Sequence, residues 1–394
     1  MEEQRTSKKL DRWLIIAIFI FTGLIALLTA CSSIEGESVQ SSAVVPVAAP
    51  CPECEEFICP EPVRYEDVWA ESPHADSEAE AFIHWNDTEP QEIPTECAKC
   101  HSRPGFIDFL GVDGTTANQV DSPAMTGTTI TCFVCHNEVI DDITSVEFPS
   151  GAKVRMLGPE VRCVLCHQGR ASTRTVDDAL IELELFEPDV PTAELNFINS
   201  HSTSAATPFG SEVQGAYQYA GKTYSGLFKR GDDFFACTRC HNQHSLEINS
   251  DSCAECHTLD GTEPRDIRVD TTDYDGDGNN VEGIAYEISS MHDALYDAIR
   301  SYANQVSGTP IVYDITTYPY FFIDTNGNGV LDAEENLSEN SYNAWTPRLL
   351  KAAYNYNYVT HDPGAFAHNS DYILQVLYDS LADLGGDVTG MARP

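Results

Sequence analysis

The sequence predicts a mostly irregular and α-helical fold with small β-hairpins, and three observations lead to this expectation. Ten of the 14 cysteines recur in one short motif, regular apolar spacing is confined to a few segments, and 62 acidic residues oppose 22 basic ones. With 394 residues and 42% hydrophobic content the chain can bury a core, which excludes a disordered acidic tail. Length alone allows two or three domains, or one domain with extensions.

Regular elements are expected in only a few places. Apolar residues recur at helical spacing in residues 284–303, 344–358 and 371–384, which predicts three helices. Alternating residues next to turn signals predict β-hairpins at residues 144–156 and 216–227. The rest of the chain is expected to be irregular.

Five pentapeptides have the form Cys-x-x-Cys-His, and we number them motif 1 to motif 5 in chain order. Their cysteines and histidines are Cys97, Cys100 and His101; Cys132, Cys135 and His136; Cys163, Cys166 and His167; Cys237, Cys240 and His241; and Cys253, Cys256 and His257. Two thiols at this spacing add to the vinyl groups of haem, and the next imidazole reaches the iron. Zinc sites and disulfides need no histidine directly after each pair, so covalent c-type haem explains the pattern better.

The pattern resembles the multihaem c-type cytochromes of anaerobic bacteria. Residues 166–170, 221–224 and 342–356 are similar to a family of membrane-associated polyhaem cytochromes c from metal-reducing and related anaerobes, and the resemblance spans Trp69 to Leu384. Its members are described as electron carriers. The motifs are unevenly spaced, which excludes a solenoid. Few residues are available for each of five haems, so stacked haems are expected to form much of the core.

Seven histidines lie outside the motifs and supply candidates for the second axial ligand of each iron. His244 follows motif 4 by three residues, a placement that in many multihaem cytochromes ligates an adjacent haem. His74 and His368 lie in segments that resemble the distal-ligand segments of nitrite- and hydroxylamine-converting multihaem cytochromes. His201 precedes small residues that would let a porphyrin approach closely. Through His368, the last third of the chain would close over a haem of the first part.

His84 is the fifth candidate for a distal ligand. Its spacing of ten residues from His74 would allow both side chains to lie on one amphipathic helix. His292 and His361 are expected to be ordinary core or surface histidines instead.

Residues 1–30 are expected to be a lipoprotein signal peptide. A basic start precedes an apolar run at residues 13–28, and the small residues before Cys31 resemble the lipobox of bacterial lipoproteins, in which this cysteine is lipidated. The alternative is an uncleaved anchor helix with a chance cysteine. Both place the folded part outside the cytoplasm, and the residue after Cys31 favours sorting to the outer membrane or cell surface.

Three further segments are expected after the signal peptide. Residues 31–66 are a Pro/Glu-rich tether, residues 67–260 a five-haem domain, and residues 261–394 a calcium-loop and helical segment that packs on it. The tether carries Cys51, Cys54 and Cys59. This odd set predicts one disulfide and a spare thiol, with a three-thiolate metal site as the alternative.

Two acidic loops predict one or two calcium ions. The first matches a twelve-residue EF-hand loop, with oxygen ligands from Asp324, Asn326, Asn328, Val330, Asp332 and Glu335. The second begins in the same way at Asp273, Asp275 and Asp277, but its twelfth position is apolar. Glu282 or Glu287 would have to complete it. An extended aromatic run precedes the first loop, so a structural ion is expected rather than a helix–loop–helix sensor.

The sequence therefore predicts an extracytoplasmic electron carrier rather than an enzyme. Bis-histidine iron has no open position and a low potential without Met ligation, and the acceptor would be external or membrane-associated. A net charge of −40 excludes nucleic acid and favours redox partners, such as other cytochromes, with basic docking patches. One alternative is a reductase of nitrite, hydroxylamine or a sulfur oxyanion with one open haem. The other is a protomer of an extracellular cytochrome filament or other homo-oligomer.

Overall fold

The computed structural model describes residues 64–155, 158–230, 236–259 and 263–394. The lipidation site predicted at Cys31 and the cysteines of the tether, Cys51, Cys54 and Cys59, lie outside these residues. All described residues belong to one compact unit. No helix within the described ranges is both long enough and apolar enough to cross a membrane.

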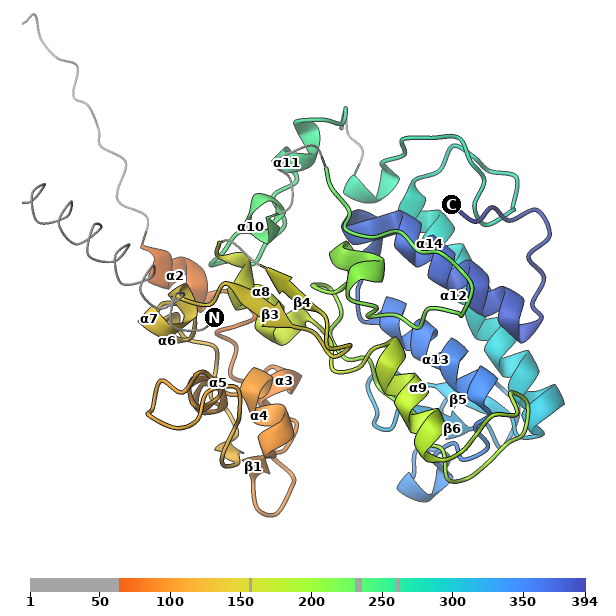
Figure 1. Cartoon of the computed structure of the whole chain (residues 1–394), viewed down its shortest axis with the longest axis horizontal. Helices are drawn as coiled ribbons and strands as arrows, with labels where there is room; N and C mark the ends of the chain where they lie inside the picture. The colour runs from red at the N-terminus through yellow and green to blue at the C-terminus, as the bar shows by residue number, and fades with distance from the viewer. Residues whose placement is uncertain (1–63, 156–157, 231–235, 260–262) are drawn as a thin grey trace, which may run out of the picture. The chain divides into compact units, whose positions relative to one another are not determined.

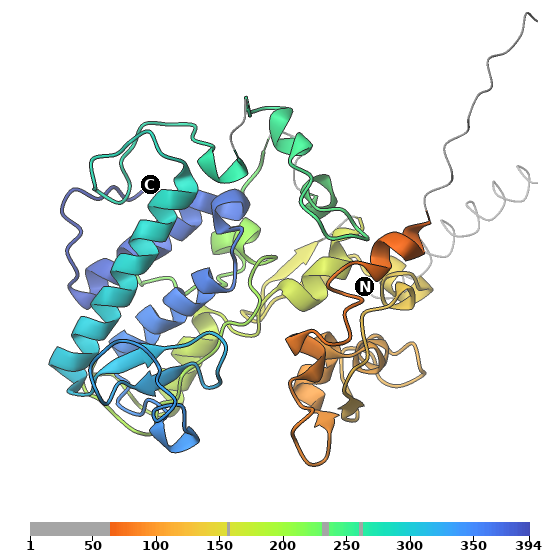
Figure 2. The same cartoon turned by 180° about the vertical axis from the view of Figure 1, so that it is seen from behind.

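Three long helices carry much of the buried apolar core: α12 (Ile284–Tyr302), α13 (Pro347–Thr360) and α14 (Ala365–Leu384). They pack side by side, as both views show (Figures 1 and 2). All three predicted helices are confirmed, with shifted boundaries for two. α13 begins at Pro347 because the hydroxyl of Thr346 caps the helix by accepting a hydrogen bond from the Leu349 amide. α14 begins before the predicted segment and has non-helical backbone angles at Asn369.

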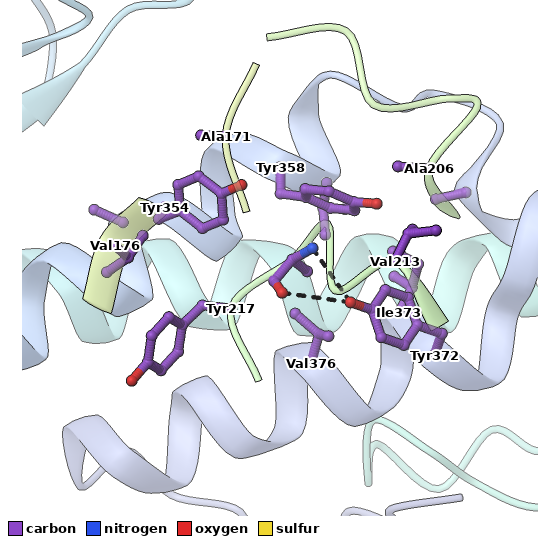
Figure 3. Close-up of a cluster of buried hydrophobic side chains, with 14 of the residues drawn as sticks. Ala171, Val176, Ala206, Val213, Tyr217, Tyr354, Tyr358, Tyr372, Ile373 and Val376 are labelled. Carbon is purple, nitrogen blue, oxygen red and sulfur yellow. Dashed lines mark hydrogen bonds between the residues drawn. The ribbon is translucent and has the colours of Figure 1, made fainter. Parts of the chain in front are cut away.

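Aromatic side chains fill the space between α13, α14 and an earlier segment of the chain. Tyr354 and Tyr358 of α13 and Tyr372 of α14 are at most 1% exposed (Figure 3). The Tyr372 hydroxyl accepts a hydrogen bond from the backbone amide of Ala216 at 3.2 Å. The segment around Ala216, which lies between motifs 3 and 4 in the sequence, is therefore part of the same core as the C-terminal helices.

The hairpin predicted at residues 216–227 is wrong. This segment forms no strand, and two of its amides bond to side chains of the C-terminal helices. Tyr217 N donates to Asn355 Oδ1 at 2.6 Å, and Ser225 N donates to Gln375 Oε1 at 2.7 Å. Buried amides need partners, and α13 and α14 provide them without a second strand.

The remaining helices are short. They are α2 (Tyr65–Ala70), α3 (Glu80–Ile83), α4 (Thr95–His101), α5 (Arg103–Leu110), α6 (Cys132–Cys135), α7 (Glu138–Asp141), α8 (Glu160–His167), α9 (Thr173–Glu182), α10 (Cys237–Cys240) and α11 (Asp251–Ala254). Short segments of other helix types are η1 (Thr207–Glu212), η2 (Pro264–Asp266), η3 (Ala303–Ser307) and η4 (Ser338–Asn340).

The described strands form three antiparallel pairs. These are β1 (Glu92–Ile93) with β2 (Ala124–Met125), β3 (Ser145–Glu147) with β4 (Lys153–Arg155), and β5 (Ile311–Tyr313) with β6 (Phe321–Ile323). The pairing of β3 with β4, with Val146 opposite Val154, confirms the hairpin predicted at residues 144–156. The expectation of a mostly irregular and helical chain with small hairpins is borne out, while a core of stacked haems stays a prediction.

Candidate haem-attachment cluster

Each of the five motifs lies on or next to one short helix, from α4 for motif 1 to α11 for motif 5. A single helical turn places residues three apart on the same face, so both thiols of a motif point the same way. In motifs 2, 4 and 5 the amide of the histidine donates to the carbonyl of the first cysteine, at 2.8–2.9 Å. The histidine is thereby held one turn beyond the first cysteine, as attachment of one haem to all three residues requires.

Four motif histidines each face a histidine from elsewhere in the chain. The pairs and their ring-centre distances are His74–His167 (6.3 Å), His101–His201 (5.5 Å), His136–His244 (6.2 Å) and His241–His368 (6.4 Å). Two imidazoles that bind opposite sides of one metal, each with a bond of about 2 Å, have ring centres roughly 6 Å apart. The structure thus brings each of the four preferred distal candidates to a motif histidine at the spacing of an axial pair.

Burial keeps the most enclosed of these imidazoles neutral. Desolvation lowers the pKa of His167 to about 4, with smaller effects from His74 and His241. Desolvation also lowers the pKa of His201 to about 3, and the neighbouring His101 adds to the effect. A neutral imidazole offers the lone pair that a metal needs. The donor set therefore fits haem iron.

His201 carries two further signs of a functional position. Its backbone has a φ of 63°, which is uncommon for a residue other than glycine, and its buried Nδ1 has no hydrogen-bond partner among the described residues. Such strain persists only where surrounding structure imposes it, and it clusters at functional sites. The backbone thereby holds the imidazole toward motif 1, where its Nε2 lies 3.3 Å from that of His101.

Polar neighbours orient the rings of His167 and His368. The Nδ1 of His167 lies 3.0 Å from the Ser202 hydroxyl, and the Nδ1 of His368 lies 2.7 Å from a carboxylate oxygen of the buried Asp362. A partner on Nδ1 fixes the ring and leaves Nε2 for the metal. Sequence reasoning missed Ser202 and Asp362. Neither belongs to a motif, and only the fold shows that they bond to these rings.

Motif 3 lies against three other motifs. The contacts are between the thiols of Cys166 and Cys100, between the thiols of Cys163 and Cys237, and between Arg162 Nε and the Cys135 carbonyl oxygen, which accepts at 2.5 Å. The contact with Cys166 is the largest cause of a pKa of about 7 for Cys100. Motif 5 joins motif 4, because the Ser252 hydroxyl donates to the Arg239 carbonyl at 2.5 Å. The order in space therefore differs from the order in sequence. Motif 3 contacts motifs 1 and 4, and Arg162, the residue directly before it, contacts motif 2.

A cavity of about 350 Å³ opens beside motif 4. His241 and His244 line it together with Tyr65 and Val68 of α2. The rings of Tyr65 and His244 are 4.7 Å apart. This space, bordered by imidazole and apolar surface, suits part of a flat macrocycle with an iron at its centre.

The other candidate histidines lie in different surroundings. His84 is bonded to Glu80 at 2.9 Å and touches Trp85, and the expectation that it shares a helix with His74 is wrong because His74 follows α2 in a turn. His292 is an ordinary, partly buried histidine, as predicted. Its ring stacks on Tyr356 at 4.1 Å, and its Nε2 lies 2.9 Å from the Tyr356 carbonyl oxygen.

His361 lies beside the pair that includes His201. Its Nδ1 lies 2.9 Å from the carbonyl oxygen of Asn357, and its ring centre is 6.3 Å from that of His201. The backbone contact holds the ring at the end of α13. In contrast to the four paired candidates, it has no motif histidine in ring contact among the described residues.

The second predicted calcium loop gathers its acidic residues. The carboxylates of Asp273, Asp275 and Glu287 lie within 4.8 Å of one another, as do those of Asp275, Asp277 and Glu282. Buried oxygens of Asp275 and Glu282 have no hydrogen-bond partner in the described part of the chain. Burial, followed by neighbouring charges, raises the pKa of both groups. Holding these carboxylates close together, with unpartnered buried oxygens, costs free energy that a bound cation would offset.

The first predicted calcium loop is closed by its own hydrogen bonds. Asp324 accepts from three backbone amides of the loop, and Glu335, 2% exposed, accepts from Thr325. Arg300 lies 3.8 Å from Asp324. Within the described residues this loop does not bring three carboxylates together, so its calcium site stays a prediction from the pattern.

The comparisons with known proteins concern most of the chain. No protein-family model and no solved structure matches it. It is 24% identical over 383 residues to the C-type polyheme cytochrome OmcB of Geobacter sulfurreducens, covering 78% of this chain and 46% of OmcB. It is 23% identical over 367 residues to the C-type polyheme cytochrome OmcC of the same species, covering 78% and 44%. The chain thus spans less than half the length of these curated relatives. Its motifs and this similarity make the chain a homologue of the polyhaem c-type cytochromes.

Proposed function

We propose that this protein is an extracytoplasmic electron carrier that holds five c-type haems, with bis-histidine ligation at motifs 1 to 4. The four histidine pairs carry the proposal, because their ring separations suit axial ligands on opposite sides of one iron. When bound, haem supplies one-electron exchange between ferric and ferrous iron. The chain contributes the attachment thiols, neutral axial imidazoles, and helices that keep the attachment sites in contact.

The polar and apolar surroundings of the pairs support this assignment. The Ser202 hydroxyl and the Asp362 carboxylate fix the rings of His167 and His368, so that little rearrangement accompanies a change of iron charge. Two imidazoles leave no position for a substrate at these irons, which favours electron transfer over catalysis. The contacts of motif 3 with motifs 1, 2 and 4, and of motif 4 with motif 5, support close approach of all five sites.

We further propose where the protein acts and with what. Lipidation at Cys31 would anchor it at the outer membrane or cell surface, and residues 31–66 would serve as a tether. Its formal charge of −40 favours redox partner proteins with basic patches, including other cytochromes. The terminal acceptor would be external or membrane-associated.

Low-temperature electron paramagnetic resonance and magnetic circular dichroism on the purified holoprotein test the assignment. We expect low-spin bis-imidazole signals from at least four haems, because four histidine pairs are in place. Mass spectrometry of the denatured protein should show five haem additions. Fewer additions would contradict the count of five haems. High-spin signals from several haems, or rapid turnover of nitrite or hydroxylamine, would contradict an electron carrier.

We also propose that the second acidic loop binds one calcium ion through Asp273, Asp275, Asp277 and Glu282. The unpartnered buried oxygens of Asp275 and Glu282 support this, because a hard cation would satisfy both. Glu287 also lies close, but its carboxylate is paired with Arg268. The ion would pin the start of α12 to the preceding loop.

Calcium removal is expected to destabilise the protein through this loop. Calcium at one hundred times its dissociation constant should stabilise the fold by about 2.7 kcal/mol relative to a chelator. Asp275→Asn should abolish most of this difference in a denaturant titration followed by far-ultraviolet circular dichroism. Asp178→Asn, at an exposed ion pair on α9, is the matched control and should retain it. An unchanged calcium response in Asp275→Asn would argue against the site.

A further inference from the structure

Every histidine of the chain lies within the described residues, so each of the 12 can be placed. Eight form the four pairs, and His84, His257, His292 and His361 remain. Of these, His257 belongs to motif 5. Among the described residues it is the one motif histidine with no second histidine in ring contact.

The three histidines outside the motifs that remain are held in other places. His292 is stacked on Tyr356 and bonded to its carbonyl oxygen. His361 is bonded to the backbone at the end of α13. His84 is bonded to Glu80 of α3. To reach motif 5, each would have to leave these contacts.

Motif 5 nevertheless has the local structure of the other motifs. The amide of His257 donates to the Cys253 carbonyl at 2.9 Å, as in motifs 2 and 4, so the imidazole is placed to bind the iron. α11 is tied to motif 4 through Ser252, and the carboxylate of Glu255 lies 2.9 Å from the guanidinium of Arg239. Cys256 is exposed to solvent. The motif is thus complete for attachment and lies at an exposed edge of the cluster.

Methionine sulfur is the other common axial donor, and three of the five methionines lie in the described residues. Met291 is fully buried in α12, Met391 packs against the helical core, and Met125, with an exposed side chain, lies in β2, paired with β1. α11 packs mainly on α10, which carries no methionine. Met1 and Met156 lie outside the described residues.

We infer that no histidine of this chain fills the sixth position of the iron at motif 5, and that this position binds a small neutral ligand of ferrous haem from solution. The inference rests on the proposed function for the presence of haem at motif 5. It makes motif 5 chemically different from motifs 1 to 4, where two protein imidazoles occupy both faces of the iron. It also places the one exchangeable site at the end of the cluster, next to motif 4.

Carbon monoxide is a suitable probe, because it binds ferrous haem only where a coordination position is free or weakly held. The fully reduced five-haem protein is expected to bind one equivalent per chain, and the ferric protein to show one high-spin haem beside four low-spin ones. His84→Ala should leave this stoichiometry unchanged. Replacing Cys253 and Cys256 with serine should remove one haem and all carbon monoxide binding, with the other four spectra retained.

Several results would overturn the inference. If carbon monoxide does not bind to a protein that is shown by its mass to carry five haems, a residue of this chain completes the site. Binding that disappears as the protein concentration rises a hundredfold would mean that a second copy supplies the ligand. Should the double-serine variant fail to accumulate, the stoichiometry and spin state of the unsubstituted protein still decide. Five low-spin haems together with no carbon monoxide binding would refute this inference and leave the proposed electron carrier intact.

Discussion

Replacing His74 with alanine is expected to convert one haem from low-spin to high-spin, about a fifth of the ferric signal of a five-haem protein. The reason is that the ring of His74 faces that of His167 in motif 3 at 6.3 Å, with an interplanar angle of 28°. Magnetic circular dichroism would measure the conversion. The reduced variant should also bind one more equivalent of carbon monoxide than the unsubstituted protein.

His84→Ala is the matched control for this experiment. His84 lies ten residues further along, and its side chain is 49% exposed and bonded to Glu80. We expect that removing the His84 side chain leaves the spin state of every haem unchanged. If His84→Ala instead produced the new high-spin haem and His74→Ala did not, the pairing of His74 with His167 would be wrong.

The pairing also shows what the sequence could and could not predict. Attachment motifs are local, because one turn of chain holds both thiols and the imidazole, so all five could be identified from residue order. The distal candidates could be chosen from their neighbours in sequence. Their partners could not, since His74 precedes motif 1 yet faces motif 3. The long-range bond from the Ile130 amide to the His74 carbonyl oxygen, at 3.1 Å, helps to place it there.

The C-terminal third illustrates the same limit. Helical spacing predicted α12, α13 and α14, because each presents an apolar stripe to the core. Spacing gave no indication that side chains such as Asn355 and Gln375 would bond to backbone amides of residues 216–227. Those bonds replace the pairing of a hairpin, which is why the hairpin prediction failed there and succeeded at β3 and β4. Local turn signals do not reveal a competing partner from a distant part of the chain. Gln375, whose side-chain oxygen accepts a hydrogen bond from the Ser225 amide, lies 150 residues beyond Ser225.

Replacing Arg268 with methionine is expected to destabilise the fold by about 3–5 kcal/mol. Arg268 bonds at 2.5 Å to Glu287, whose side chain is fully buried, and the substitution would leave that carboxylate without its counter-charge. Glu287 also accepts hydrogen bonds from the backbone amides of Tyr274 and Asp275, at 2.8 and 2.9 Å. These bonds fix the backbone of the second acidic loop. Denaturant titration followed by far-ultraviolet circular dichroism would measure the loss.

Arg174→Met is the matched control, because Arg174 and Asp178 form an ion pair with both side chains 63% exposed. Exposed pairs contribute about 0–1 kcal/mol, so this loss should be small. The carboxylate of Glu287 lies within 4.8 Å of those of Asp273 and Asp275, and a bound calcium ion would offset part of the missing positive charge. Arg268→Met should therefore lose more stability in a chelator than in calcium. A loss below about 1 kcal/mol in both conditions would mean that the Glu287 carboxylate loses its counter-charge at little cost, and that this ion pair does not hold the loop against α12.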